Sequence, residues 1–148
     1  MNNNNNNNLV IYIGADHAGF AAKEKLKSWL LNMGHDVTDV GTTSESSCHY
    51  PDYANSVAER VLKNSNSRGI LLCGSGFGVD MAANRFKGIR AARCLSVEDA
   101  WLCRAHNDAN VLCLPARLID DTKIINITKA WLESAFEGGR HQIRIDMF

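Results

Sequence analysis

Cys73 is followed by glycines at positions 74, 76 and 78, within the stretch GILLCGSGFGVDMAANR that covers residues 69–85. A continuous apolar run precedes the thiol, so Cys73 is predicted at the end of a buried strand, with the glycines leading into a helix. Backbone N–H groups at a helix N-terminus can hold an anion, and the partial positive charge there favours a thiolate. Such a thiolate is a usable base near neutral pH. The glycines alone are equally consistent with a tight turn that lets a helix pack on a sheet.

The spacing of the glycines excludes two nucleotide-binding motifs. The dinucleotide fingerprint G-x-G-x-x-G requires a glycine where Val79 stands. The segment GADHAGF at residues 14–20 has the two glycines of a P-loop, but Phe20 and Ala21 replace the residues that would hold a triphosphate and its Mg²⁺. The anion expected beside Cys73 is therefore a phosphate or a negatively charged reaction intermediate.

Three arginines are candidate phosphate ligands. Arg117 follows the fifth predicted strand, and Arg140 and Arg144 stand four residues apart in GGRHQIR. A guanidinium group can bind phosphate through two parallel hydrogen bonds. Taken alone, such charges more commonly form a solvated face, but a glycine nest in the same chain makes a phosphate clamp a real alternative.

Two histidines and an aspartate complete the set of candidates. His17 lies in ADH directly after the first predicted strand, and His106 lies in AHNDAN before the fifth. An isolated histidine is usually structural or exposed, but these two stand among small polar residues with no evident packing demand. Asp16 would repel a phosphate, so a sugar hydroxyl or a histidine N–H is its expected partner.

Alternating strands and helices must position these residues. Strands are expected near residues 9–13, 36–41, 69–73, 89–94 and 110–115, and helices near residues 20–33, 51–62, 77–86 and 120–136, with one more that is capped by Ser96 and holds Trp101. This order predicts an α/β fold of three layers, Rossmann-like, with a five-stranded parallel sheet between helices. Ligands bind such sheets beyond the carboxyl ends of the strands. The loops expected to form the site are residues 14–19, 41–50, 73–78, 94–96 and the segment after Leu114.

Length and composition indicate one domain over residues 9–148, preceded by a low-complexity asparagine tail at residues 1–8 that is expected to be disordered. Sixteen Lys and Arg balance sixteen Asp and Glu, which argues against a nucleic-acid or membrane-surface partner. No apolar run approaches the roughly 18 residues of a membrane span, and the first residues lack the features of a signal peptide. Five cysteines without a C-x-x-C pair are expected to be reduced thiols in the cytoplasm, without a zinc site.

Together these motifs resemble the type B ribose-5-phosphate isomerases, in the family that also holds galactose-6-phosphate isomerase subunits. The resemblance rests on ADHAGF, YPDYA, CGSGFGVDMAANRFKGIRAA, HNDANVL and EGGRHQIR, and it runs from about residue 9 to residue 146. It implies a cofactor-free and metal-free aldose–ketose isomerase of the pentose phosphate pathway, which interconverts D-ribose 5-phosphate and D-ribulose 5-phosphate through an enediolate. It also implies a homodimer with shared active sites, and it leaves open whether dimers pair into tetramers.

The resemblance also assigns roles to the candidate residues. Cys73 is implied as the base and His106 as the residue that opens the sugar ring. Other members carry a glutamate where Val79 stands, so this chain resembles the cysteine type. The substrate-binding residues implied are Asp16, His17, Tyr50, Gly74, Ser75, Gly76, Phe77, Gly78, Asn107, Arg117, Arg140 and Arg144, of which residues 74–78 match the anion-binding loop and the three arginines match the phosphate ligands.

Two other functions stay open. Phe77 is bulkier than the branched aliphatic residue expected in the loop, so the size of the substrate stays open. The alternative is a six-carbon substrate such as allose or galactose 6-phosphate. A non-catalytic protein that binds sugar phosphates would keep the same pocket, but it would not need a reactive thiol at Cys73.

Overall fold

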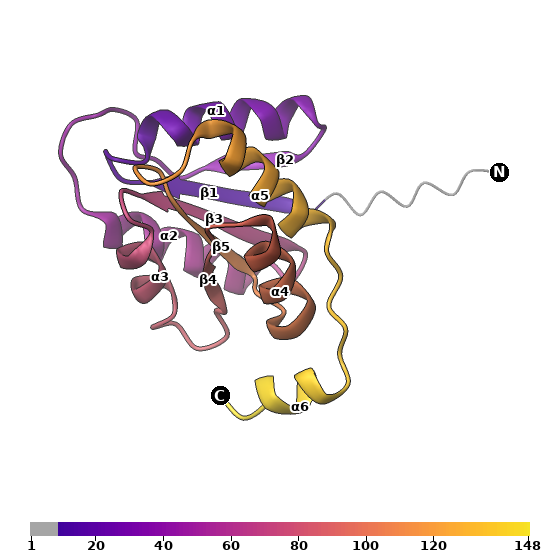
Figure 1. Ribbon diagram of the computed structural model, residues 1–148. Coiled ribbons are helices and arrows are strands. Elements are labelled where there is room, and N and C mark those ends of the chain that lie inside the picture. Colours follow the sequence, from indigo (N-terminus) through magenta and orange to yellow (C-terminus); the bar gives the residue numbers. More distant parts are fainter. Residues whose placement is uncertain (1–8) are drawn as a thin grey trace.

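The computed structural model describes residues 9–148, and the predicted tail of residues 1–8 lies outside this part (Figure 1). The strands are β1 (Val10–Ala15), β2 (Asp36–Asp39), β3 (Ser67–Cys73), β4 (Ala91–Arg93) and β5 (Val111–Pro115). The helices are α1 (Phe20–Asn32), α2 (Tyr50–Lys63), α3 (Phe77–Ala83), α4 (Val97–Asn107), α5 (Asp121–Glu133) and α6 (Arg140–Ile145). Every predicted strand and helix is present, and the predicted cap of α4 is confirmed, because Ser96 accepts the N–H of Asp99 at 3.0 Å. The sequence pattern does not predict α6.

The strands form one parallel sheet in the order β2-β1-β3-β5-β4, which confirms the predicted α/β fold. In this register Cys73, the last residue of β3, lies beside Pro115, the last residue of β5. Strands β1 and β3 are neighbours at the centre of the sheet. The chain continues from β1 to β2 at one edge of the sheet, and from β3 to β4 and β5 on the opposite side. A crevice for a ligand therefore opens beyond the carboxyl ends of β1 and β3.

Helices cover both faces of the sheet (Figure 1). On one face α1, α4 and α5 enclose a core that includes Leu26 and Trp131, and on the other α2 and α3 enclose a core that includes Val57 and Val79. The central strands are buried on both faces, which explains their unbroken apolar runs. Cys73 points to the α2–α3 side. No described helix has both the length and the apolar character needed to cross a membrane.

An ion pair between a buried lysine and a partly exposed aspartate fixes the start of the loop of residues 41–49. Lys23 in α1 has no exposed side-chain surface, and its Nζ lies 2.6 Å from Oδ2 of Asp39 at the end of β2. Burial alone would raise the pKa of Asp39, but hydrogen bonds from Lys23 and Lys27 bring it below its usual value. The other carboxylate oxygen of Asp39 accepts the N–H of Gly41 at 2.8 Å, so the pair holds the loop where it leaves the sheet.

The C-terminal segment returns to α4. The N–H of Glu137 donates to the carbonyl of Ala105 at 3.0 Å, and α6 then packs against α4. Figure 1 shows α6 set apart from the two helix layers, at the end of the segment that follows α5. The side chains of α6 therefore lie near those of α4 rather than over the sheet.

Candidate active site

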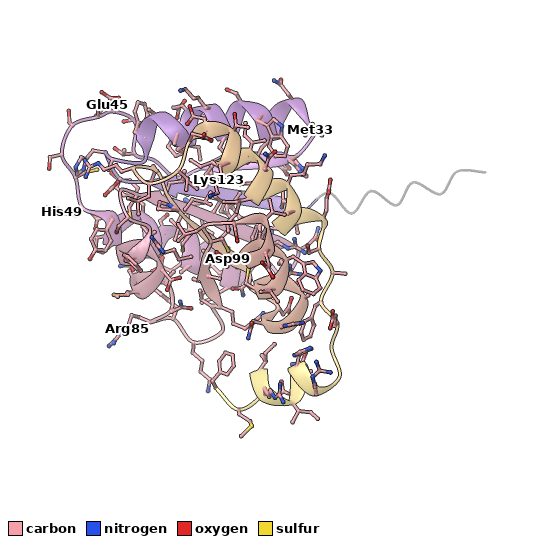
Figure 2. The ribbon with its side chains drawn as sticks, in the orientation of Figure 1. Met33, Glu45, His49, Arg85, Asp99 and Lys123 are labelled. Atoms are coloured by element: carbon pink, nitrogen blue, oxygen red, sulfur yellow. The ribbon has the colours of Figure 1, made fainter. Side chains whose placement is uncertain are left out.

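A cavity of about 350 Å³ opens at the carboxyl edge of the sheet, beyond β1 and β3. Its lining residues, which we call the thiol half-site, are Asp16, His17, Ala18, Tyr50, Cys73, Gly74, Ser75, Gly78, Arg117 and Leu118. They come from the end of β3, from the loops after β1, β3 and β5, and from the first turns of α2 and α3, as the topology predicts. His49, labelled in Figure 2, directly precedes Tyr50 at this edge. The predicted loop of residues 94–96 contributes none of the lining residues.

The Cys73 thiol meets a backbone donor in the glycine loop, residues 74–78. The N–H of Gly76 points at Sγ of Cys73 with an N···S distance of 3.2 Å. Gly76 has a φ of +77°, and a Cβ there would lie 3.2 Å from the backbone of both Leu114 and Pro115, so the position requires glycine. The loop therefore places a backbone donor at the sulfur of Cys73, at the wall of the cavity.

Two further glycines make room for side chains of the half-site. A Cβ on Gly78 would lie 2.6 Å from Cζ of Tyr50, so the ring of Tyr50 lies directly against the loop. A Cβ on Gly74 would lie 3.1 Å from Nη1 of Arg117. The backbone N–H of Arg117 also donates to the carbonyl of Gly74 at 3.0 Å. Glycines at these positions therefore allow Tyr50 and Arg117 to pack on the loop, in addition to exposing its backbone N–H groups.

Asp16 and His17 enter the cavity from the end of β1. One carboxylate oxygen of the buried Asp16 accepts the N–H groups of Ala18 at 3.0 Å and Gly19 at 3.1 Å, so the start of α1 holds this side chain in place. Nδ1 of His17 accepts the N–H of Cys48 at 3.3 Å. A neutral imidazole bonded in this way carries its proton on Nε2. His17 is therefore set as a hydrogen-bond donor, and Asp16 as an acceptor that suits a sugar hydroxyl.

Arg93, at the end of β4, supports the glycine loop and is a residue that the sequence analysis missed. Its Nε donates to the carbonyl of Ser75 at 2.6 Å, and its Cζ lies 3.9 Å from the centroid of the Phe77 ring. Phe77 is half exposed and its side chain does not line the cavity, so its bulk does not reduce the space for a substrate. The sequence signal that could have identified Arg93 is its position as a charged residue at the end of a predicted strand, just before the loop of residues 94–96.

A second group, which we call the histidine half-site, consists of His106, Asn107, Arg140 and Arg144. The ring of His106, in the last turn of α4, is stacked on His141 with 4.4 Å between centroids. The exposed Arg140 and Arg144 stand four residues apart on α6, which puts them on one side of that helix.

The two half-sites lie at opposite edges of the sheet within one chain. Helix α4 begins after β4 at the carboxyl edge and ends at Asn107, just before β5 starts at the amino edge. Strand β3 has seven residues, so the two edges are about 20 Å apart. One chain therefore brings the predicted residues of the thiol half-site together and places those of the histidine half-site elsewhere.

Within residues 9–148, the group whose donor atoms could hold a metal ion is His106, Glu137 and His141, with those atoms within 4.8 Å of one another. Nε2 of His106 lies 3.8 Å from Oε2 of Glu137, and Nε2 of His141 lies 3.5 Å from it. Burial, helped by the nearby His106 and Arg140, lowers the pKa of His141 below its ordinary value. The expected absence of a metal stays a prediction. Glu137 and His141 were missed, although GGRHQIR placed a histidine beside a candidate arginine.

Cys73 should react with iodoacetamide much faster than Cys113. Cys73 lines the cavity, where a reagent can reach it, whereas Cys113 is fully buried and burial raises its pKa well above the ordinary value. We expect a rate difference on the order of tenfold or more, because the thiolate is the reactive form. Peptide mass spectrometry over a time course measures both rates. Equal rates at the two cysteines would contradict the site geometry.

The chain is similar to known proteins over nearly all of its length. The family model described as Ribose/Galactose Isomerase matches residues 11–148. A probable ribose-5-phosphate isomerase B of Mycoplasma genitalium is 45% identical over 138 residues, which cover 92% of this chain and 91% of that protein. Ribose-5-phosphate isomerase B of Escherichia coli is 43% identical over 136 residues, with 92% and 91% covered.

Solved structures agree with these sequence relatives. A crystal structure of a ribose 5-phosphate isomerase from Thermotoga maritima matches with a TM-score of 0.92 and 50% identity, over 94% of this chain and 96% of that one. Ribose-5-phosphate isomerase B of Mycoplasma genitalium with bound ribulose-5-phosphate matches with a TM-score of 0.90 and 44% identity, over 93% and 92%. The chain therefore belongs to the ribose/galactose isomerase family.

Proposed function

We propose that this chain interconverts D-ribose 5-phosphate and D-ribulose 5-phosphate through an enediolate, with Cys73 as the base. As a member of its family the chain is an isomerase, and similar proteins named for this reaction include one with bound ribulose-5-phosphate. The observation that carries the proposal is the N–H of Gly76 directed at Sγ of Cys73, at the wall of a cavity that also contains Arg117. The reaction would serve the pentose phosphate pathway in the cytoplasm, where five reduced thiols are expected.

The half-site suits the chemistry of aldose–ketose isomerisation. In the open-chain aldose, the thiolate of Cys73 takes the proton from carbon 2, and the electron pair of that bond forms the enediolate. The hydroxyl proton of oxygen 2 passes to oxygen 1, and the proton on sulfur returns to carbon 1, which gives the ketose. Backbone N–H groups of residues 74–78 can stabilise the enediolate oxygens, and one such preorganised donor is worth about 3–4 kcal/mol. Arg117 binds the phosphate at the far end and so positions the reacting carbons.

A second copy of the chain would complete the site. His106, which would open the furanose ring, and the further phosphate ligands Arg140 and Arg144 lie at the opposite edge of the sheet from Cys73 in one chain. A homodimer that sets the histidine half-site of one copy against the thiol half-site of the other resolves this separation. Exposed apolar side chains on the same helices support an interface there: Val97 and Trp101 of α4, and Ile143, Met147 and Phe148 in and after α6.

The names of similar proteins support the five-carbon substrate over the six-carbon alternative, because they give ribose 5-phosphate as the substrate. Phe77 does not distinguish the two sugars, since its ring packs under Arg93 and does not line the cavity. A protein that only bound the sugar would have no need for a donor aimed at the thiol. The test is a coupled isomerase assay that compares ribose 5-phosphate with allose 6-phosphate.

In that assay Cys73→Ala should abolish turnover and leave substrate binding within about tenfold, because the base is lost while the phosphate ligands stay. Cys113→Ala is the matched control, since this thiol is buried away from the cavity. Turnover by the wild type and the control, with none by Cys73→Ala, is the expected pattern. A near-normal kcat in Cys73→Ala would show that the base lies elsewhere.

His106→Asn should separate ring opening from proton transfer. Ribose 5-phosphate is mostly a closed furanose, whereas ribulose 5-phosphate cannot close the corresponding ring because its phosphate blocks the required oxygen. We therefore expect the variant to lose much of its turnover from ribose 5-phosphate while it keeps most of its deuterium incorporation at carbon 1 of ribulose 5-phosphate in D₂O. Nuclear magnetic resonance measures this incorporation, and the wild type must first be shown to catalyse it. Equal losses of turnover and incorporation would overturn the ring-opening role.

Arg144→Ala should raise the KM for ribose 5-phosphate by the equivalent of about 1.5–3 kcal/mol, the range for hydrogen bonds to charged groups. If the two half-sites meet across subunits, mixing Cys73→Ala and Arg144→Ala chains should restore part of the activity, because one mixed site contains neither substitution. Subunit exchange is verified by native mass spectrometry. Exchange without recovered activity would place both residues in the site of the same chain.

A further inference from the structure

A second cavity lies at the amino edge of the sheet, away from Cys73. It has a volume of about 300 Å³, and its lining residues are Leu9, Val61, Asn64, Ser65, Ser67, Arg68, Arg90, Arg104, Asp108 and Asn110. Leu9 precedes β1, Ser67 and Arg68 begin β3, and Asn110 precedes β5, so the cavity sits where the strands start. We call it the amino-edge cavity. None of its residues belongs to either half-site.

Positive charge in the amino-edge cavity exceeds negative charge. Arg104 pairs with Asp108 at 2.8 Å, and Arg90 contacts the other oxygen of the same carboxylate at 3.4 Å. Arg68 donates to two backbone carbonyls of α5 and, within the described chain, pairs with no carboxylate. The lining residues thus include three guanidinium groups and one carboxylate, which leaves an excess of two positive charges in the cavity wall.

One of these guanidinium groups is buried and incompletely hydrogen-bonded. Arg104 is only 6% exposed, and Nη1 donates to Asp108 and to the carbonyl of Ala109. Its Nε–H meets no acceptor among the described residues. Burial, and secondarily the charge of Arg104, lowers the pKa of Arg68 to about 10. Burial and the neighbouring charge of Arg104 both disfavour the charged form of Arg68, so an anion added beside Asp108 would stabilise this pair of guanidinium groups.

We propose that the amino-edge cavity binds a dianion of the phosphate class, either inorganic phosphate or a small phosphate monoester. A phosphate monoester carries nearly two negative charges at neutral pH and therefore matches the excess positive charge. Its several oxygens suit planar guanidinium donors, and Ser65 adds a hydroxyl at the exposed rim. The volume accommodates a phosphate together with a small organic group.

An anion in this cavity would also affect the conformation of the turn at the end of α4. Nε of Arg90 donates to the carbonyls of Asn107 at 3.2 Å and Asp108 at 3.0 Å. Asp108 closes α4 with a φ of +47°, directly after His106 and Asn107. A bound phosphate would therefore fix the turn that presents the histidine half-site. This consequence rests on the proposed function, whereas the binding itself does not.

The test is binding of inorganic phosphate to the full chain, measured by isothermal titration calorimetry. An Arg117→Leu background removes a main phosphate ligand of the thiol half-site, and saturable phosphate binding should persist in it. Adding Arg68→Leu should weaken that binding by at least about tenfold, the scale of one charged hydrogen bond. Loss of all phosphate binding in Arg117→Leu alone, or unchanged affinity after Arg68→Leu, would overturn the proposal.

If Arg68→Leu fails to fold, a second pair of variants tests phosphate binding in the amino-edge cavity. Ser65 is exposed at the rim, so Ser65→Asp adds a carboxylate without disturbing the core, and Ser65→Asn is the uncharged match. In the Arg117→Leu background, Ser65→Asp should weaken phosphate binding at least about fivefold, while Ser65→Asn stays within about twofold. Equal affinities in these two variants would refute the site. Because calorimetry reads phosphate alone, its result is independent of whether the isomerase assay succeeds.

Discussion

The hydrogen bond from the N–H of Gly76 to the sulfur of Cys73 is the contact on which the site depends, and it requires the whole carboxyl edge of the sheet. Gly76 reaches the thiol only in a left-handed conformation, pressed against the backbone where β5 ends. Hydrogen bonds from Arg93 to Ser75 and from Arg117 to Gly74 hold the loop on either side of that glycine. A slip of β3 against β5 would move the thiol away from its donor.

A parallel sheet also explains why the candidate residues fall into two groups. Every strand in it points the same way, so loops after strands gather at one edge, while the end of α4 arrives at the other. His106 and Cys73 are therefore held apart by the length of a strand in any chain with this topology. Under the proposed roles, Cys73 and His106 would act together only across two copies, so the proposed chemistry requires an oligomer.

The sequence predicts best what depends on local pattern. The strand ending at Cys73, the cap at Ser96 and the gathering of Asp16, Tyr50 and Arg117 at one edge follow from apolar runs and from the rule for parallel sheets. Contacts made between distant segments escape such reasoning. The hold of Arg93 on the glycine loop depends on strand order, which the pattern does not determine.

Short or irregular elements are also not predicted from local sequence pattern. Helix α6 has six residues, too few to show a helical period, and the preceding GG gives no signal that a helix will follow. The contact between His17 and the N–H of Cys48 is likewise hidden, because 31 residues separate the partners and the loop between them has no regular pattern. These are the places where tertiary packing, rather than local sequence, decides the arrangement of the site.

Carboxylates near Cys73 bear on whether a thiol is the appropriate base. Val79, for which the resemblance implies a glutamate in other members, is fully buried in the α2–α3 core, so this part of α3 is used for packing. Asp80 is the nearest carboxylate along the chain, and burial raises its pKa. However, Asp80 accepts a hydrogen bond from Asn84, whose amide also bonds both backbone groups of Ala91, and it does not line the cavity. That carboxylate joins α3 to β4. Within the half-site the carboxylate is Asp16, which accepts the N–H groups of Ala18 and Gly19, and the proposed base is the thiol across the cavity that accepts the N–H of Gly76.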